Sequence, residues 1–202
     1  MTLKKKVLII NYGSGNYNSI INTVKKFNCN VVVDNTKSSI DKADVVILPG
    51  VGTFYSAVNS LKKNNIFNYL KKNSDSGKFI LGICLGLQVM SINSNEIKFT
   101  KGLKIMQGHV KKLDNVSHIG WNKVNFEKNS AFNFLDKKYF YFQHQYYVYG
   151  NNLKDKGYFF LKNKKILAYT RKLNTYGVQF HPEKSQESGL DFFKIFFDKV
   201  HA

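Results

Sequence analysis

A cysteine between two glycines is the first residue pattern in this chain that could carry out chemistry. Residues 82–86 read Gly-Ile-Cys-Leu-Gly, and Cys84 stands between an apolar segment and a segment with helical spacing. This is the pattern of a nucleophile elbow with sulfur in place of oxygen, since the glycines leave room for a tight strand-to-helix turn. Such a turn would present the sulfur at the carboxyl edge of a sheet, where the N-terminus of the next helix favours a thiolate. The pattern predicts a nucleophile, and a buried structural cysteine between packing glycines stays open as the alternative.

The sequence also contains a base and an orienting acid in one tripeptide. Residues 181–183 read His-Pro-Glu and follow an apolar stretch, so His181 should end a strand. Side chains two residues apart on an extended chain point the same way, and Pro182 stops the strand, so Glu183 could fold back onto the imidazole and hold its tautomer. Alone, the tripeptide is more typical of a surface loop. Together with Cys84 it makes a nucleophile, a base and an orienter, which is an apparatus for acyl transfer.

An acyl-transfer site needs donors for the oxyanion, and a glycine-rich loop is placed to supply them. Residues 49–52 read Pro-Gly-Val-Gly and follow a short apolar segment. The glycines allow amide N–H groups of this loop to turn toward the thiol, and the N–H of the residue after the cysteine can add another donor. We therefore predict an oxyanion hole made by Gly50, Val51, Gly52 and Leu85.

No pattern in the sequence indicates a metal or a cofactor. The five histidines lack ligand spacing, and Cys29 is not part of a Cys-x-x-Cys pair, so we interpret Cys29 as a packing residue. The glycine-rich residues 12–16 match neither nucleotide-binding fingerprint. We interpret them as a turn at the edge of the sheet, and we expect a protein that works without a cofactor.

The first half of the chain predicts the layer that would position these groups. The strand-like segments are residues 6–11, 30–34, 45–48 and 78–83, and the segments with helical spacing are 19–27, 54–70 (in one or two pieces) and 85–92. Continuously apolar strands separated by helices predict a parallel sheet that is covered on both faces and joined by right-handed crossovers. The expected fold class is therefore α/β, with a doubly wound, mostly parallel sheet.

The second half changes character and predicts antiparallel additions. Its strand-like segments, separated by short polar gaps, are residues 103–110, 118–126, 139–144, 158–161, 166–171 and 176–180. Residues 190–200 then predict an amphipathic helix at the end of the chain. Since no repeat, low-complexity linker or boundary interrupts the pattern, we expect one domain over residues 1–202.

Composition limits the class of protein further. Of the 202 residues, 43% are hydrophobic, which is enough for one substantial core. No apolar run reaches the ~18 residues of a membrane span, and the N-terminal run Val-Leu-Ile-Ile is too short for a signal peptide. Two cysteines cannot form a disulfide framework. We expect a soluble, cytoplasmic protein without a membrane partner.

The net charge of +18 raises the question of a nucleic-acid partner. The basic residues are lysines apart from a single arginine, Arg171, and they are scattered along the chain as pairs. A protein that grips phosphate would use arginine, whose fork matches phosphate geometry. We interpret the lysines as a solvated surface and expect no nucleic-acid partner, while an acidic partner protein stays open.

Segments over almost the whole chain resemble one known family. They are residues 11–16, 48–54, 82–88, 118–122, 141–147 and 177–185, in the order of the family. On these segments the chain resembles the glutaminase subunits of imidazole glycerol phosphate synthase, which are class I, triad-type glutamine amidotransferases of histidine biosynthesis. The cysteine pentapeptide with a later His-Pro-Glu marks triad amidotransferases in general. The Pro-Gly-Val-Gly, Gly-Trp-Asn and His-Pro-Glu-Lys-Ser sequences point to this branch.

The resemblance implies a flavodoxin-like glutaminase fold and a role for each residue of the triad. Cys84 would attack the side-chain amide of glutamine, His181 would move protons, and Glu183 would orient the imidazole. The thioester would be hydrolysed to glutamate, and the ammonia would pass to a separate cyclase subunit with a (β/α)8 barrel, in a heterodimer. The loop 49–52 would rearrange to complete the oxyanion hole, so that activity would depend on the partner.

The resemblance also implies residues for the substrate and for the subunit interface. Those for glutamine would be Gln88, His144, Gln145 and Tyr146. Those for the interface would be Asn16, Trp121 and Lys184.

Several positions depart from the pattern of the family. Asn11 stands where Asp is usual. Further along the chain, Ser117 replaces a Pro, Ile119 replaces a Met, and Gln145 replaces a Ser. The segment after residue 88 is shortened and lacks the usual Glu-rich stretch. These changes leave open a sister glutaminase that supplies ammonia to an amidotransferase of surface-sugar (amidino sugar) biosynthesis, as well as a catalytically silent interaction module.

Overall fold

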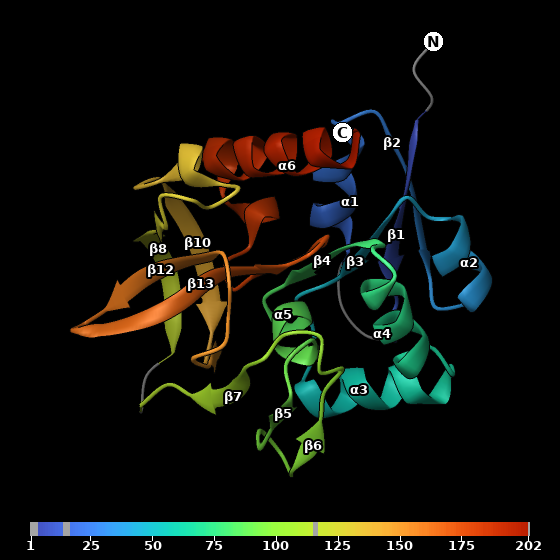
Figure 1. Ribbon diagram of the computed structural model, residues 1–202, viewed down its shortest axis with the longest axis horizontal. Helices are drawn as coiled ribbons and strands as arrows, with labels where there is room; N and C mark the ends of the chain where they lie inside the picture. Colours follow the sequence, from blue (N-terminus) through green and yellow to red (C-terminus); the bar gives the residue numbers. More distant parts are fainter. Residues whose placement is uncertain (1–3, 14–16, 115–116, 202) are drawn as a thin grey trace.

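One eight-stranded sheet forms the centre of the molecule (Figure 1). The structure is a computed structural model, and it describes residues 4–13, 17–114 and 117–201. The strands are, in spatial order, β2 (Cys29–Asp34), β1 (Lys5–Ile10), β3 (Val45–Leu48), β4 (Phe79–Ile83), β14 (Thr175–Val178), β13 (Lys164–Lys172), β12 (Lys156–Leu161) and β9 (Asn125–Phe126). From β2 to β14 the neighbours pair in parallel, and from β14 to β9 they pair antiparallel. The predicted α/β fold with a mostly parallel sheet is confirmed, and its first five strands follow the flavodoxin order.

Helices cover both faces of this sheet. One face carries α1 (Asn18–Lys25) and α6 (Gln186–His201), and the other carries α2 (Lys37–Lys42), α3 (Phe54–Lys63), α4 (Phe67–Asp75) and α5 (Leu85–Val89) (Figure 1). Successive residues of a strand point to opposite faces, so Val7 and Ile9 pack with α1 while Leu8 and Ile10 pack with α2. Strands that are buried on both faces must be apolar throughout, which is the pattern seen in the sequence.

The C-terminal helix supplies much of one core. Four phenylalanines of α6 are buried against the sheet, and they are Phe192, Phe193, Phe196 and Phe197. Their spacing of three and four residues places them on one side of the helix, as the amphipathic pattern predicts. None of the helices in the described parts of the chain combines the length and the apolar character that a bilayer crossing requires.

Three short antiparallel pairs are added outside the main sheet. They are β5 (Asn93–Ser94) with β6 (Thr100–Lys101), β7 (His109–Lys112) with β11 (Tyr146–Tyr149), and β8 (His118–Lys123) with β10 (Tyr139–His144). Two 3-10 turns complete the structure, η1 (Asn133–Leu135) and η2 (Pro182–Lys184). The β8–β10 pair lies beside β12 (Figure 1), and its outer face is therefore left for other contacts.

Residues 103–110 differ from the predicted strand. Only the last two of them belong to one, β7, although Leu103 and Ile105 are fully buried. The N–H groups of Leu103 and Ile105 donate to Val89 O and Met90 O at 2.9 Å, so this segment packs along the end of α5. The same contact ends α5 at Val89, before the predicted residue 92. The apolar pattern of residues 103–110 thus predicts correctly that Leu103 and Ile105 are buried, but the prediction that the whole segment forms a strand is wrong.

Other differences concern short elements. The helical stretch 54–70 is divided into α3 and α4, because Asn65 adopts a left-handed backbone with φ of 56°. The sequence pattern does not predict α2, in which only Ile40 is buried, or the tyrosine-rich β11. The predicted turn at residues 12–16 lies partly outside the described residues.

Candidate active site

Cys84 stands at the junction of β4 and α5, in a backbone conformation that few residues adopt. Its φ is 47°, on the sparsely populated positive side for a residue with a Cβ. The Cys84 N–H donates a hydrogen bond to Val178 O at 2.7 Å, so the neighbouring strand β14 holds the turn. The cysteine thereby lies at the carboxyl edge of the sheet, where open α/β folds bind ligands.

Two glycines allow this turn because backbone atoms occupy the places of their side chains. A Cβ on Gly86 would lie 2.0 Å from Leu48 O, and a Cβ on Gly82 would lie 2.7 Å from the Gly86 carbonyl carbon. No side chain fits at such distances in a close-packed interior. The glycines therefore let α5 approach β3 and β4 closely enough to form the turn.

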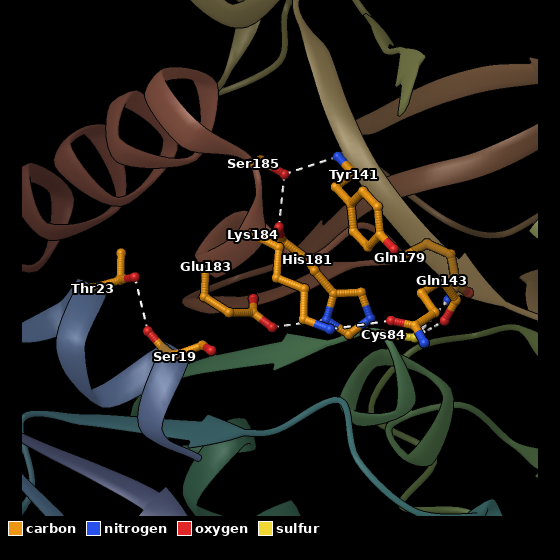
Figure 2. A network of polar contacts seen from close by, with 10 residues as sticks. All are labelled: Ser19, Thr23, Cys84, Tyr141, Gln143, Gln179, His181, Glu183, Lys184 and Ser185. Atoms are coloured by element: carbon orange, nitrogen blue, oxygen red, sulfur yellow. Dashed lines mark hydrogen bonds and ion pairs between the residues drawn. The ribbon is translucent and has the colours of Figure 1, made fainter. Parts of the chain in front are cut away.

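His181 reaches the same edge of the sheet from the end of β14. Its ring Nδ1 lies 2.8 Å from Glu183 Oε1, and the two side chains are only 6% and 5% exposed. The turn η2 folds Glu183 back, and Ser185 Oγ donates to His181 O at 2.7 Å, which fixes the turn. Figure 2 shows the imidazole between the Glu183 carboxylate and Cys84. The structure thus brings together the three residues that the sequence singles out.

The surroundings of His181 favour a protonated ring. Burial disfavours the imidazolium, but the Cys84 sulfur and the Glu183 carboxylate outweigh it and raise the pKa of His181 to about 10. Because Nδ1 faces Glu183, Nε2 is the nitrogen left for the sulfur. An imidazolium at this place stabilises a thiolate, the nucleophilic form of cysteine.

Two glutamines also contact the sulfur, and the sequence analysis missed both. Gln179 Nε2 donates to Cys84 Sγ at 3.3 Å, and Cys84 Sγ lies 3.8 Å from the backbone oxygen of Gln143. Gln179 lies two residues before His181, so the two side chains share one side of the extended chain. That alternation is the signal that could have identified Gln179 from the sequence.

The glycine loop after β3 lies against the cysteine and the histidine. A Cβ on Gly50 would be 2.8 Å from His181 Cε1 and 3.0 Å from Cys84 Cβ, so only a bare backbone passes here. Gly50, Gly52 and Leu85 line the same cavity as the cysteine, and Val51 is not among its lining residues. The loop backbone is thus adjacent to the Cys84 side chain, which is the placement that the predicted oxyanion hole needs.

A cavity of about 300 Å³ opens beside the sulfur. It is lined by Gly50, Gly52, Cys84, Leu85, Gln88, Glu96, Ser117, Ile119, Gln143, His144, Gln145 and Tyr146. All four residues predicted for the substrate are in this set, and Gln88 Nε2 donates to Tyr146 O at 2.8 Å. Within the described residues, no cluster of His, Cys, Asp and Glu side chains is placed to hold a metal ion.

His144 has both ring nitrogens in contact with the protein itself. Nδ1 lies 2.9 Å from Tyr146 O, and Nε2 lies 3.3 Å from His118 Nδ1. Burial, with His118 as a second cause, lowers the pKa of His144 to about 3, so the ring is neutral. His144 therefore shapes the wall of the cavity, and its ring is committed to neighbours on β8 and β11.

The sequence analysis also missed an acidic side chain in the cavity. Glu96 lies between β5 and β6, and its Oε2 accepts a hydrogen bond from the N–H of Phe54, the first residue of α3, at 2.6 Å. Burial raises the pKa of Glu96. Nothing in the local sequence marks this residue, because its place in the cavity depends on a contact with a segment 42 residues earlier.

The predicted interface residues lie on the outer face of the β8–β10 pair, as far as they are described. Trp121 is 45% exposed and packs edge-on against Tyr141, with ring centroids 6.0 Å apart. Lys184 Nζ lies 5.8 Å from the centre of the same tyrosine ring and donates to Gln143 Oε1 at 3.1 Å (Figure 2). Asn16, the third predicted residue, lies outside the described residues. Trp121, Tyr141 and Lys184 thus form one patch beside the sulfur, which we call the aromatic patch.

Comparison with known proteins identifies the class of protein to which this fold and site belong. Residues 8–200 match the family described as glutamine amidotransferase class-I. The chain belongs to this family, whose members are glutamine-hydrolysing amidotransferases.

Two curated relatives within this family carry the same name. The imidazole glycerol phosphate synthase subunit HisH of Chlorobaculum tepidum is 36% identical over 197 residues, which cover 94% of this chain and 98% of that protein. The subunit of the same name from Lactococcus lactis subsp. lactis is 37% identical over 201 residues, covering 97% and 100%.

Solved structures share the fold at low sequence identity. PurLQS from Thermotoga maritima matches with a TM-score of 0.78 at 16% identity, over 98% of this chain and 99% of that chain. A glutamine amidotransferase from the same organism matches with a TM-score of 0.64 at 18% identity, over 98% and 84%. These similarities concern the fold.

Proposed function

We propose that this chain is the glutaminase subunit of an imidazole glycerol phosphate synthase and that it releases ammonia from glutamine for histidine biosynthesis. The relatives named HisH support this pathway, because they are 36–37% identical over nearly the whole of both chains. The observation that carries the chemistry is the convergence of Cys84, His181 and Glu183 beside a cavity of about 300 Å³.

In the first half of the reaction Cys84 becomes acylated. Its thiolate attacks the side-chain amide carbon of glutamine, and the carbonyl oxygen takes the negative charge. Leu85 N–H and the Gly50–Gly52 backbone stabilise this oxyanion, while Gln179 Nε2 donates a hydrogen bond to the sulfur. The tetrahedral intermediate collapses when His181 Nε2 gives its proton to the departing nitrogen, so ammonia leaves and a thioester remains.

In the second half the thioester is hydrolysed. The neutral imidazole of His181 takes a proton from water, and the resulting hydroxide equivalent attacks the thioester carbon. The C–S bond breaks, Cys84 returns as a thiolate, His181 is again protonated, and the new carboxylic acid leaves as glutamate after it gives its remaining proton to solvent. Glu183 keeps Nδ1 occupied at 2.8 Å, so Nε2 remains the nitrogen that transfers the proton in both steps.

The cavity also fits the charged end of an amino-acid substrate. Glu96 lines it and would pair with the α-ammonium group of glutamine. Gln88 is held by Tyr146 O, which keeps the wall next to the sulfur in one conformation.

A partner subunit with a (β/α)8 barrel is part of this proposal. Exposed aromatic and apolar side chains gather on β8 and β10, where Ile119, Trp121 and Tyr139 are 64%, 45% and 53% exposed. Aromatic side chains that are exposed in this way are typical of protein interfaces. The aromatic patch shares Trp121 with this surface, and its Lys184 contacts Gln143, whose backbone oxygen lies 3.8 Å from the Cys84 sulfur, so a partner docked there could receive ammonia without its passage through bulk water.

The sister glutaminase of amidino-sugar biosynthesis is not favoured, because the relatives carry the imidazole glycerol phosphate synthase name. The assembled triad argues against a silent interaction module. A cytoplasmic location also belongs to the proposal, since the reaction needs a reduced thiol and both Cys29 and Cys84 are free cysteines.

Glutamate release by the complex with the partner subunit tests the proposal. Cys84→Ala should abolish glutamine hydrolysis and leave the fold and partner binding intact. Cys29→Ala is the matched control, because Cys29 lies in the core away from the cavity, and it should keep the parental rate. Release of glutamate at the parental rate by Cys84→Ala would refute the assignment.

A further inference from the structure

The backbone that carries His181 lies where the chain leaves the sheet. Strand β14 ends at Val178, and the turn η2 begins at Pro182, which cannot continue an extended strand. The imidazole contacts Glu183 and Cys84, but the ring can stay in line with the sulfur only if the backbone of His181 is also fixed. Contacts with a neighbouring element must therefore hold this backbone.

The neighbouring element is β10. The His181 N–H donates to Tyr141 O at 2.8 Å, so the two backbones share one direct hydrogen bond. In a hydrogen-bonded pair of antiparallel strands, the opposed residues exchange a second bond between the other N–H and the other carbonyl. Here a side chain makes that second connection: Tyr141 N–H donates to Ser185 Oγ at 2.9 Å, and Ser185 Oγ donates to His181 O at 2.7 Å (Figure 2). We call these three hydrogen bonds the Ser185 bridge.

A hydroxyl suits this place because it accepts one hydrogen bond and donates another. Ser185 is only 1% exposed, so the Tyr141 N–H would be left without its partner if the hydroxyl were removed. The backbone of Ser185 is itself anchored. Its N–H donates to Pro182 O, and its carbonyl oxygen accepts from Gly189 N–H in α6, both at 3.1 Å. The Ser185 bridge thus joins β10 to η2 and to the first turns of α6.

The strand β10 also contacts the nucleophile. Gln143 O lies 3.8 Å from Cys84 Sγ, two residues along the strand from Tyr141. Residues two apart on a strand are separated by about 7 Å, and the strand keeps this spacing constant. The base is therefore attached to β10 at Tyr141 and the sulfur lies against it at Gln143, so one strand sets the position of both reacting groups.

We infer that Ser185 is a positioning residue whose hydroxyl fastens His181 to β10 and so keeps the imidazole in line with the Cys84 sulfur. The inference rests on the proposed function for the reaction, and it concerns a residue that does not line the cavity beside the sulfur. The same strand carries the Tyr141 ring, against which Trp121 of the aromatic patch packs. A partner docked on the aromatic patch would therefore act on the strand that positions both reacting groups.

Kinetics of the complex with the partner subunit test the inference. Ser185→Ala removes the bridging hydroxyl and should lower kcat for glutamine by about tenfold, because a small displacement of a reacting group slows a reaction strongly. The KM should stay unchanged, since the variant leaves the lining of the cavity intact. The NMR titration of His181 in the isolated chain should move to lower pH, because a displaced ring loses its contacts with Cys84 and Glu183 but remains buried.

Two further variants keep the test decisive. Ser74→Ala is the matched control, because Ser74 is also a buried serine and its Oγ lies 2.7 Å from Thr175 Oγ1, at the start of β14. This variant loses a buried hydroxyl of the same kind and should keep both kcat and the titration of His181. Ser185→Cys fills the same place with a weaker hydrogen-bonding group, so it answers the question if Ser185→Ala does not fold.

An unchanged kcat in a folded Ser185 variant, or an unchanged titration midpoint of His181, would overturn the inference. An equal loss of kcat in Ser74→Ala would also overturn it, because the effect would then belong to any buried serine. A parent complex that releases no glutamate would overturn the proposed function. The titration of His181 needs no turnover, so it would still show whether Ser185 holds the ring.

Discussion

The side-chain amide of Gln179 donates a hydrogen bond to the sulfur of Cys84 over 3.3 Å. Gln179 is completely buried, and its carbonyl oxygen accepts from Gln88 Nε2 at 3.4 Å, so the amide is held with its nitrogen toward the sulfur. Hydrogen bonds to a charged acceptor are about twice as strong as those to a neutral one. A donor at this place therefore stabilises negative charge on the sulfur when it acts as a nucleophile or leaving group.

Replacing this donor should make Cys84 less reactive. We predict that Gln179→Leu lowers both the rate of Cys84 alkylation by iodoacetamide at pH 7 and kcat/KM for glutamine by about tenfold, from the loss of one charge-assisted hydrogen bond. The alkylation is measured in a Cys29→Ala background, where Cys84 is the only cysteine. Gln107→Leu, on the surface, serves as the control and should have no effect. A folded Gln179→Leu variant that reacts at the parental rate would show that the amide does not support the thiolate.

The proton on His181 should depend on Glu183. Because burial is outweighed by Cys84 and Glu183, the pKa of His181 lies near 10, and we predict that Glu183→Gln shifts the titration of His181 to lower pH. The ring signals of His181 in an NMR pH titration measure this shift directly. An unchanged titration midpoint in the variant would contradict the role of Glu183 as the partner of the ring.

The same shift links stability to pH. Folding raises the pKa of His181 above its unfolded value of about 6.5, so the stabilisation is complete below that value and is lost as the pH rises through about 10. We predict that the free energy of unfolding of the parent, measured relative to His181→Gln, falls as the pH is raised toward 10. Urea unfolding at several pH values gives this difference in the free energy of unfolding. A difference that rises with pH would contradict the prediction.

The turn at Cys84 should tolerate no side chain at Gly86. A Cβ there would lie 2.0 Å from Leu48 O, so Gly86→Ala must displace α5 from β3 and should cost at least about 3 kcal/mol of stability. Gly13→Ala is the contrasting control, since Gly13 has a positive φ but open space around it, and the backbone strain alone should cost only about 1 kcal/mol. Equal costs in urea unfolding would mean that the close approach of α5 has no energetic role.

The aromatic patch should determine partner binding and activation. We predict that the isolated chain hydrolyses glutamine slowly, that its synthase partner and the acceptor nucleotide accelerate it, and that Trp121→Ala weakens the complex about tenfold. Leu173→Ala is the control, because Leu173 is 59% exposed in the β13–β14 turn, at the opposite edge of the sheet. Calorimetric titration of Trp121→Ala and of Leu173→Ala with the partner subunit measures the affinity of each variant. Equal affinities for the partner, or equal rates with and without it, would contradict the proposed interface or the dependence on the partner.

The parallel half of the fold could be predicted because strands that are buried on both faces are continuously apolar in the sequence. Residues 45–48 are apolar without interruption, and the strand β3 has the bounds that the pattern predicts. Residues 103–108 also contribute buried apolar side chains, Leu103, Ile105 and Met106, but the segment packs along α5 and forms no strand. Periodicity reports where a side chain is buried, and tertiary context decides which element buries it.

The residues of the candidate site also differ in how far the sequence predicts them. Cys84, His181 and Glu183 could be proposed because each stands in a short local pattern that already implies its geometry. Glu96 could not, since its place in the cavity depends on a contact with a residue 42 positions earlier in the sequence. The fold brings together residues that line a cavity, and no local sequence pattern predicts such a residue.

In the proposed reaction glutamine acylates Cys84, and trapping the acyl-enzyme makes this step visible. The complex with the partner subunit is mixed with L-glutamine, quenched in acid within the first turnovers, and digested for mass spectrometry. We expect the peptide containing Cys84 to gain the mass of one glutamyl group and the peptide containing Cys29 to keep its mass. A complex that releases glutamate under these conditions while Cys84 is never modified, and that still does so as Cys84→Ala, would show that glutamine is hydrolysed without acylation of Cys84.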